Sequence, residues 1–147
     1  FYEGKFFNTV IREPFRFVIH GGDAEMKKKS FKNNNLINDK SFEQFNSKIR
    51  FIPLEIMLNN EKKPRYNYQI KDPKLLNKIK LKHQVGTISM ARSKSVNSAS
   101  SQFYISLAKL SLLDGRYAVF GKITQGYNVL DLIDEGDFIN KITKVKY

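Results

Sequence analysis

The stretch from residue 102 to residue 123 constrains the fold more than any other part of the chain. It contains two strand-like segments, 102–107 and 117–123, separated by the turn residues Leu-Asp-Gly-Arg at 113–116. Aspartate and glycine are typical of tight turns, because glycine adopts positive φ without strain. Other segments rich in β-branched and aromatic residues also predict strands: 15–20, 50–58, 86–91 and 138–145. The chain is therefore expected to be mostly β.

One clear helix is predicted near the C-terminus. Asn128 can cap it and Gly136 can end it. Val129, Leu132 and Ile133 follow at the helical spacing i, i+3, i+4 and are expected to face the core. Many short strands with one such helix favour a β-barrel or a β-sandwich with helical caps.

The two faces of the segment 102–107 differ in chemistry. Side chains alternate across a strand, so Phe103, Ile105 and Leu107 are expected to point into a core. Gln102 and Tyr104 then share the opposite face. An amide that pairs with backbone groups, beside a ring that packs apolar groups, suits a peptide-binding surface. A half-exposed strand with solvent-facing side chains is the simpler alternative.

Composition excludes several classes of function. A chain of 147 residues can form one domain with a substantial core, and no apolar run approaches the ~20 residues of a membrane-spanning helix. The absence of cysteine excludes disulfides, thiolate metal sites and a cysteine nucleophile, and the two histidines cannot form a structural zinc site by themselves. The net charge of +12 favours acidic partners, but 20 of the 26 basic residues are lysine and 13 residues are asparagine. This bias indicates compositional drift, so nucleic acid is not an expected partner.

Four segments, in a matching order, resemble the motifs of the cyclophilins, a family of peptidyl-prolyl cis-trans isomerases. Residues 17–23, Phe-Val-Ile-His-Gly-Gly-Asp, resemble the motif Phe-x-x-Gln-Gly-Gly-Asp. Residues 86–91 resemble Gly-x-x-Ser-Met-Ala, and residues 101–105 resemble Ser-Gln-Phe-Phe-Ile. Residues 113–121 resemble Leu-Asp-Gly-x-x-x-Val-Phe-Gly. These motifs span most of the chain and are specific.

The resemblance implies an eight-stranded antiparallel barrel with capping helices. The first two strands and the first helix of the family would precede Phe1, so the chain is expected to be one N-terminally incomplete domain over 1–147. Residues 24–49 and 59–84 are expected to be long basic inserts within that domain. The segments similar to the chloroplast-lumen branch of the family are 53–56, 90–92 and 114–117. This plastid-type resemblance assigns no compartment to the chain.

Prolyl isomerisation breaks no bond, and its barrier of about 18–20 kcal/mol is the loss of amide resonance as the C–N bond twists. At the twisted geometry the prolyl nitrogen regains a lone pair and can accept a hydrogen bond. A fixed cationic donor aimed at that nitrogen therefore binds the twisted state better than either planar state. Arginine suits this role, because it is always charged and its donors form a rigid fork.

Two registers compete for the catalytic arginine that the resemblance implies. Counting back from the Gly-Gly-Asp at 21–23 without a gap places the arginine at Arg12 and the pocket phenylalanine at Phe17. Aligning Thr-Val-Ile at 9–11 with the Arg-Val-Ile of the family places Thr9 there instead, which would leave catalysis in doubt. The catalytic candidates are therefore Arg12, Phe17 and Gln102, which matches the second glutamine of the family.

The resemblance also implies a set of substrate-binding residues. His20 replaces a glutamine that grips the substrate backbone, and one nitrogen of a neutral imidazole can donate or accept but not both. Leu112 stands where animal cyclophilins carry tryptophan, so cyclosporin is expected to bind with weakened affinity. The other candidates are Val18, Ala91, Arg92, Tyr104, Leu113 and Tyr117.

The expected function is peptidyl-prolyl cis-trans isomerisation of X–Pro bonds, which assists protein folding. The substrates would be proline-containing polypeptides. The alternative is a weakly active or inactive cyclophilin-like module that binds such peptides or serves as a subunit of a larger assembly. No metal, nucleotide or redox cofactor is implied, because the pair Gly21-Gly22 predicts a turn and not a phosphate-binding loop.

Overall fold

Short strands dominate the computed structural model, which describes residues 2–23, 50–143 and 145. The predicted insert 24–49 lies outside the described residues. The elements are β1 (Phe7–Ile11), β2 (Val18–Gly21), β3 (Glu55–Ile56), β4 (Arg65–Tyr66), α1 (Pro73–Leu76), β5 (Thr87–Met90), β6 (Phe103–Ser106), η3 (Ser111–Leu113), β7 (Val119–Lys122) and η4 (Tyr127–Asp131). Within the described ranges, every helix is too short or too polar to cross a bilayer.

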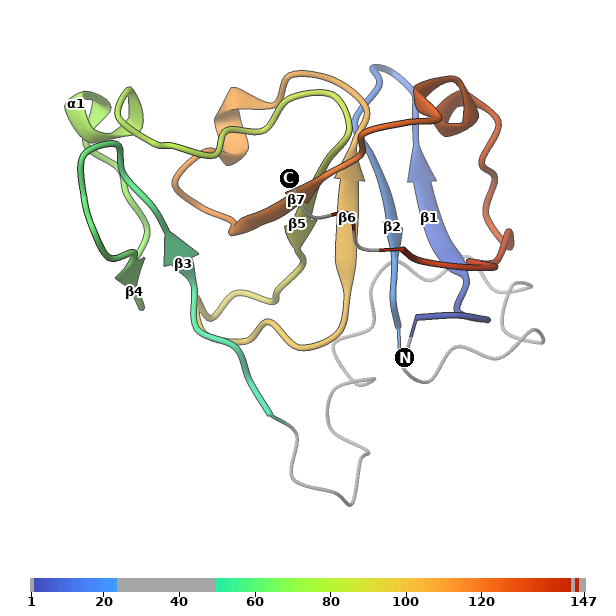
Figure 1. The fold of residues 1–147 in the computed structure, drawn as a ribbon, viewed down its shortest axis with the longest axis horizontal. Helices are drawn as coiled ribbons and strands as arrows, with labels where there is room; N and C mark the ends of the chain where they lie inside the picture. The colour runs from blue at the N-terminus through green and yellow to red at the C-terminus, as the bar shows by residue number, and fades with distance from the viewer. Residues whose placement is uncertain (1, 24–49, 144, 146–147) are drawn as a thin grey trace.

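The main sheet is antiparallel and has five strands in the order β1-β2-β6-β5-β7 (Figure 1). Although β6 and β7 are consecutive in the chain, β5 lies between them in the sheet. The turn at 113–116 is therefore part of a longer connection and does not close a hairpin. β1 and β7 are the edges of this sheet, so the described residues form an open sheet and not the closed barrel that the resemblance implies.

The segment 50–58 contributes less strand than its alternation predicts. Only the two residues of β3 are laddered, against β4, while Ile52 and Leu58 form isolated bridges. The predicted one-sided burial is nevertheless confirmed for Leu54, Ile56 and Leu58, whereas Ile52 is exposed. These side chains form a second hydrophobic cluster beside the main sheet.

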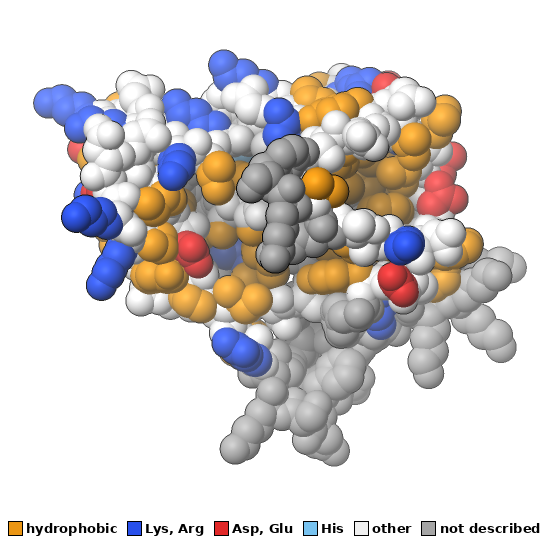
Figure 2. Space-filling view, viewed as in Figure 1, with side chains coloured by type: hydrophobic (Ala, Val, Ile, Leu, Met, Phe, Trp, Pro, Cys, Tyr) orange, Lys and Arg blue, Asp and Glu red, His pale blue; other side chains and the backbone are white. Residues whose placement is uncertain are grey.

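The predicted insert 59–84 carries β4 and the short helix α1. α1 begins after Asp72, whose side chain accepts a hydrogen bond from the backbone N–H of Lys74 at 2.8 Å. Lysine and arginine side chains gather over α1 and β4 in the left part of Figure 2. The basic charge of this insert thus lies on a solvated surface, as long charged side chains normally do.

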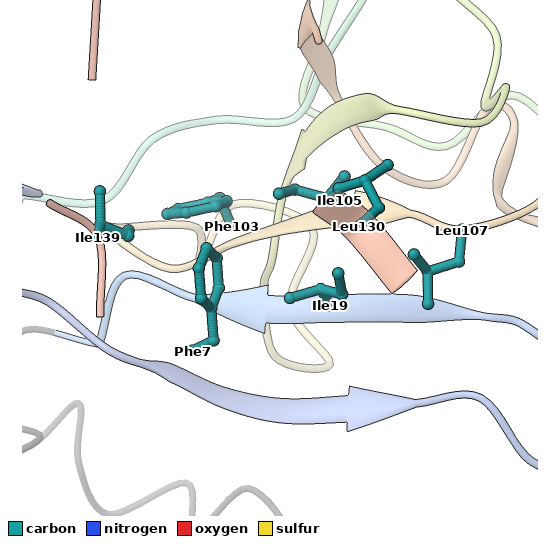
Figure 3. Packing of buried hydrophobic residues seen from close by; sticks show 7 residues of the cluster. All are labelled: Phe7, Ile19, Phe103, Ile105, Leu107, Leu130 and Ile139. Carbon is teal, nitrogen blue, oxygen red and sulfur yellow. The ribbon is translucent and has the colours of Figure 1, made fainter. Parts of the chain in front are cut away.

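The main core confirms the predicted inward face of β6. Its buried side chains are Phe7, Ile19, Phe103, Ile105, Leu107, Leu130 and Ile139. Figure 3 shows them facing one another from β1, β2, the β6 region and the C-terminal segment. Since successive side chains alternate across a strand, this packing leaves Val18, His20 and Tyr104 for the opposite face of the same strands.

The C-terminal helix η4 is a 3-10 helix and not the α-helix that the sequence predicts. Asn128 lies within it and therefore does not cap it. Val129 and Leu132 were expected in the core, but they are 48% and 73% exposed. In this helix Leu130 is the buried residue instead, whereas Ile133, which follows the helix, packs against the main core as predicted.

The last predicted strand, 138–145, is also not formed as expected. In its described part, the chain makes an isolated antiparallel bridge between Phe6 and Phe138. Backbone hydrogen bonds tie this segment to the start of the chain, from Gly4 N to Ile139 O at 2.7 Å and from Ile139 N to Lys5 O at 2.8 Å. The C-terminal segment therefore covers the core by packing beside β1 without extending the sheet.

Candidate active site

A small cavity lies on the face of β2 and β6 that is opposite the main core. Its volume is about 180 Å³. The lining residues are Thr9, Ile11, Phe17, Val18, His20, Ala91, Arg92, Tyr104, Leu113 and Tyr117. Most of this lining is apolar or aromatic, with few polar groups, as expected of a site that binds an apolar moiety.

The strand register brings one wall of the cavity together. Thr9 on β1 is paired with His20 on β2, and His20 is paired with Tyr104 on β6. Directly opposed residues of neighbouring strands point to the same face, so these three side chains form a row across the sheet. Ile11 and Val18 form the next paired row on β1 and β2.

The structure brings most of the predicted site residues to this cavity. Those that line it are Phe17, Val18, His20, Ala91, Arg92, Tyr104, Leu113 and Tyr117. Thr9, the position that the alternative register assigns to the arginine of the family, also lines the cavity. Ile11 was missed, although its spacing of two residues from Thr9 places it on the same strand face.

The structure does not bring Arg12 to the cavity, which corrects its expected placement. Its Nη2 donates to the carbonyl oxygens of Leu130 at 2.9 Å and Ile133 at 2.6 Å. Its Nη1 lies 3.7 Å from Asp134 Oδ1. The guanidinium is therefore turned toward η4 and the loop after it, where two carbonyl groups accept from Nη2, while the buried Nε has no hydrogen-bond partner among the described residues.

Gln102 and Leu112 also lie outside the cavity lining. The amide of Gln102 is buried, and its Nε2 donates to Asp23 Oδ2 at 3.1 Å. Leu112 lies in η3 and is 57% exposed. The solvent-exposed alternative for the second face of β6 is excluded, because Gln102 and Tyr104 are both buried.

A buried hydrogen-bonded chain runs from the cavity into the interior. Asp114 Oδ1 accepts from the backbone N–H of His83 at 2.8 Å and lies 2.8 Å from His83 Nδ1. His83 Nε2 lies 2.8 Å from the hydroxyl of Tyr104, and the two rings are stacked. A carboxylate can only accept, so Nδ1 carries the proton and Nε2 of the neutral ring accepts from the Tyr104 O–H.

Burial sets the protonation of the two rings in this row of hydrogen-bonded side chains. It lowers the pKa of His83, and the adjacent Asp114 carboxylate opposes that shift without reversing it. Burial also raises the pKa of Tyr104. Both rings are therefore neutral near pH 7, which keeps the Tyr104 hydroxyl a donor. Neither His83 nor its pairing with Tyr104 was predicted, since no local pattern joins residues so far apart in the sequence.

His20 is a neutral group in the cavity wall. Burial lowers its pKa to about 4, and Asp23 partly opposes the shift. Asn8 Nδ2 lies 3.3 Å from His20 Nδ1, so Nδ1 accepts and the ring proton lies on Nε2. That Nε2 is buried and has no hydrogen-bond partner among the described residues.

A family model identifies the family of the chain. The model of the family "Cyclophilin type peptidyl-prolyl cis-trans isomerase/CLD" matches residues 1–146. The chain therefore belongs to the cyclophilin-type peptidyl-prolyl cis-trans isomerase family, as its motifs predict.

Named relatives are consistent with the chloroplast-lumen resemblance. The chloroplastic peptidyl-prolyl cis-trans isomerase CYP38 of Arabidopsis thaliana is 32% identical over 99% of this chain and 32% of its own length. A Synechocystis protein named as a thylakoid lumen peptidyl-prolyl cis-trans isomerase is 31% identical over 95% of this chain and 36% of its own length. The chain thus spans about a third of the length of these curated relatives.

A solved structure supports the fold. The cyclophilin-type peptidyl-prolyl cis-trans isomerase of Cryptosporidium parvum, solved in the presence of the dipeptide Ala-Pro, matches with a TM-score of 0.50. It is 24% identical, and the match covers 90% of this chain and 61% of that chain. The predicted mostly-β, cyclophilin-like fold is therefore confirmed, with the sheet open over the described residues.

Proposed function

We propose that this domain binds proline-containing polypeptides and catalyses cis-trans isomerisation of X–Pro peptide bonds. The observation that carries the proposal is the small apolar cavity, which is lined by residues from all four matched motif segments. Membership of the isomerase family supports it, as does the dipeptide Ala-Pro named with the Cryptosporidium parvum structure.

The size and lining of the cavity suit one imino-acid ring. Its volume of about 180 Å³ is below the ≈ 300–1,000 Å³ of pockets for drug-sized ligands, so a single side chain is the better fit. Phe17, Val18, Ala91 and Leu113 supply apolar contacts on several sides. Holding the ring in such a site while the preceding carbonyl rotates is what the reaction requires.

The polar groups around the cavity have separate proposed roles. The free Nε2–H of His20 donates to a substrate carbonyl, because a buried donor gains most from the partner that it lacks. Gln102 acts as a positioning residue, because its amide holds Asp23 at the end of β2. Tyr104 forms the base of the cavity, and its hydroxyl is held by His83.

Filling the cavity tests the proposal. Ala91→Leu adds apolar bulk to the lining and fills part of the space proposed for the proline ring. It is therefore expected to weaken binding of a short X–Pro peptide by at least about tenfold. Two-dimensional NMR exchange on such a peptide reports the isomerisation rate, and chemical-shift titration reports the affinity. The matched control, Ala118→Leu, makes the same change in the second cluster, around Leu54 and outside the cavity lining. Full-rate isomerisation by a stably folded Ala91→Leu variant would contradict the assignment.

Cyclosporin is expected to bind weakly. Leu112 has no indole ring or N–H, and its exposed side chain offers less contact area than tryptophan would. Because tryptophan is a frequent hot-spot residue, Leu112→Trp is expected to tighten binding by about tenfold or more. Isothermal titration calorimetry measures both affinities. A nanomolar dissociation constant for the unaltered protein would refute this expectation.

A further inference from the structure

One permanent cation lines the cavity in the part of the chain that the structure describes. Of the described lining residues, Arg92 alone carries a charge that is present at any pH near neutrality. The two arginines of the loop after β1 face elsewhere: Arg12 bonds to carbonyls of η4 and its following loop, and Arg16 pairs with Asp131 at 2.5 Å. Thr9, which stands in the row with His20 and Tyr104, carries no charge.

The guanidinium of Arg92 is held in a fixed orientation. Its Nε and Nη2 donate to the carbonyl oxygen of Arg116 at 3.2 and 2.8 Å, and its Nη1 donates to the carbonyl oxygen of Ser93 at 2.9 Å. Its central carbon lies 4.6 Å from the ring centroid of Tyr117, which also lines the cavity. Backbone carbonyls and an aromatic face thus hold a planar cation beside the cavity.

These contacts leave donor capacity unused. A guanidinium has five N–H groups, and the three hydrogen bonds engage Nε, one N–H of Nη1 and one of Nη2. One N–H on each terminal nitrogen therefore has no partner among the described residues. The arrangement resembles a preorganised donor, because the charge is oriented before a ligand arrives.

We propose that Arg92 is the catalytic cation of this domain, donating a hydrogen bond to the prolyl nitrogen of the bound X–Pro bond as that bond twists. The inference rests on the function proposed above and adds to it the residue that lowers the barrier. No covalent bond forms or breaks. The N–H of Arg92 stays on the guanidinium, and the nitrogen lone pair accepts it only while amide resonance is lost, so the contact favours the twisted state over both planar states.

The test separates rate from affinity in the full chain. Arg92→Gln is expected to lower the exchange rate of a bound X–Pro peptide by about 100-fold, the loss typical of removing one preorganised donor. The dissociation constant of the peptide is expected to change by less than about threefold, because the contact is made in the transition state. Arg92→Lys keeps the charge without the fork and is expected to give an intermediate rate. The matched control, Lys94→Gln, removes an exposed charge from the same loop and is expected to retain the full rate.

The outcomes distinguish this inference from the proposed function. An inactive unaltered protein that also binds no X–Pro peptide would overturn both. An active unaltered protein with an equally active Arg92→Gln variant would overturn the role of Arg92 alone. Equal losses of rate and affinity in a folded Arg92→Gln variant, checked by its thermal unfolding, would also overturn it, because they would assign Arg92 to ground-state binding.

Discussion

Replacing Asp114 by alanine is expected to lower the free energy of unfolding by about 3 kcal/mol. The carboxylate Oδ1 accepts both the backbone N–H and the Nδ1–H of His83, and both residues are buried. Alanine leaves both donors without an acceptor, and each buried unsatisfied group costs ≈ 1–3 kcal/mol. Urea denaturation monitored by circular dichroism measures the change. Peptide affinity is expected to fall as well, because Leu113 and Tyr104 line the cavity next to this network.

Two further variants test how the hydrogen bonds of Asp114 and His83 stabilise the fold. Asp114→Asn has nearly the same shape and keeps an acceptor oxygen, so it is expected to lose about 1 kcal/mol. Combining Asp114→Ala with Tyr104→Phe tests whether the hydrogen bonds of Asp114, His83 and Tyr104 stabilise the fold cooperatively. His83 links the two residues, so the effects are expected to differ from additivity by about 1 kcal/mol. Strict additivity, or a stability loss by Asp114→Asn equal to that by Asp114→Ala, would contradict a shared network.

Sequence patterns predicted the strands and turns that are determined by residues close together in the sequence. The strands β5 and β6 were predicted from β-propensity, and the inward face of Phe103, Ile105 and Leu107 from the period of two in a strand. Gly22 has φ +84°, and a Cβ there would lie 2.7 Å from the carbonyl oxygen of Ser101. The prediction that glycine ends this strand therefore has a steric basis.

Patterns failed where tertiary contacts decided the structure. The spacing of apolar residues after Asn128 fits an α-helix, but the segment forms a 3-10 helix in which Leu130 packs into the core and Val129 is exposed. The position of Arg12 depended on a choice of register, because the segment between Ile11 and Phe17 is a connection with no alternation to fix it. The resemblance is specific in its motifs, but it was ambiguous in the loop that precedes the first of them.

The polar contacts of the site were the least predictable part. His83 and Tyr104 are 21 residues apart in sequence, and Gln102 and Asp23 are 79 apart. Such pairs form because the sheet order brings β2, β5 and β6 together, and no sequence period encodes that order. Arg92 could be assigned to the substrate site by resemblance. That it is the one permanently charged residue among the described residues lining the cavity became apparent only from the orientations of Arg12 and Arg16.

Acidification is expected to destabilise the protein through His20 by about 3 kcal/mol between pH 7 and pH 4. Burial lowers the pKa of His20 to about 4 in the folded protein, whereas an unfolded chain has a histidine pKa of ≈ 6.5. Between these values the unfolded chain binds a proton that the folded chain does not, so stability falls as the pH falls. The loss begins near pH 6.5 and is nearly complete by pH 4. Urea midpoints across this range measure it.

A glutamine at position 20 isolates that contribution, because other groups also respond to acid. The pKa of His83 is lowered in the same direction, and carboxylates add their own dependence. His20→Gln keeps a hydrogen-bonding side chain that cannot titrate, so the difference in stability between this variant and the unaltered protein should itself change by about 3 kcal/mol from pH 7 to pH 4. If that difference stays constant, His20 is not held neutral by burial. The ring would then become a cation in the cavity, beside Arg92, as the pH falls through the ordinary histidine pKa of ≈ 6.5, while its Nε2–H would still be a donor.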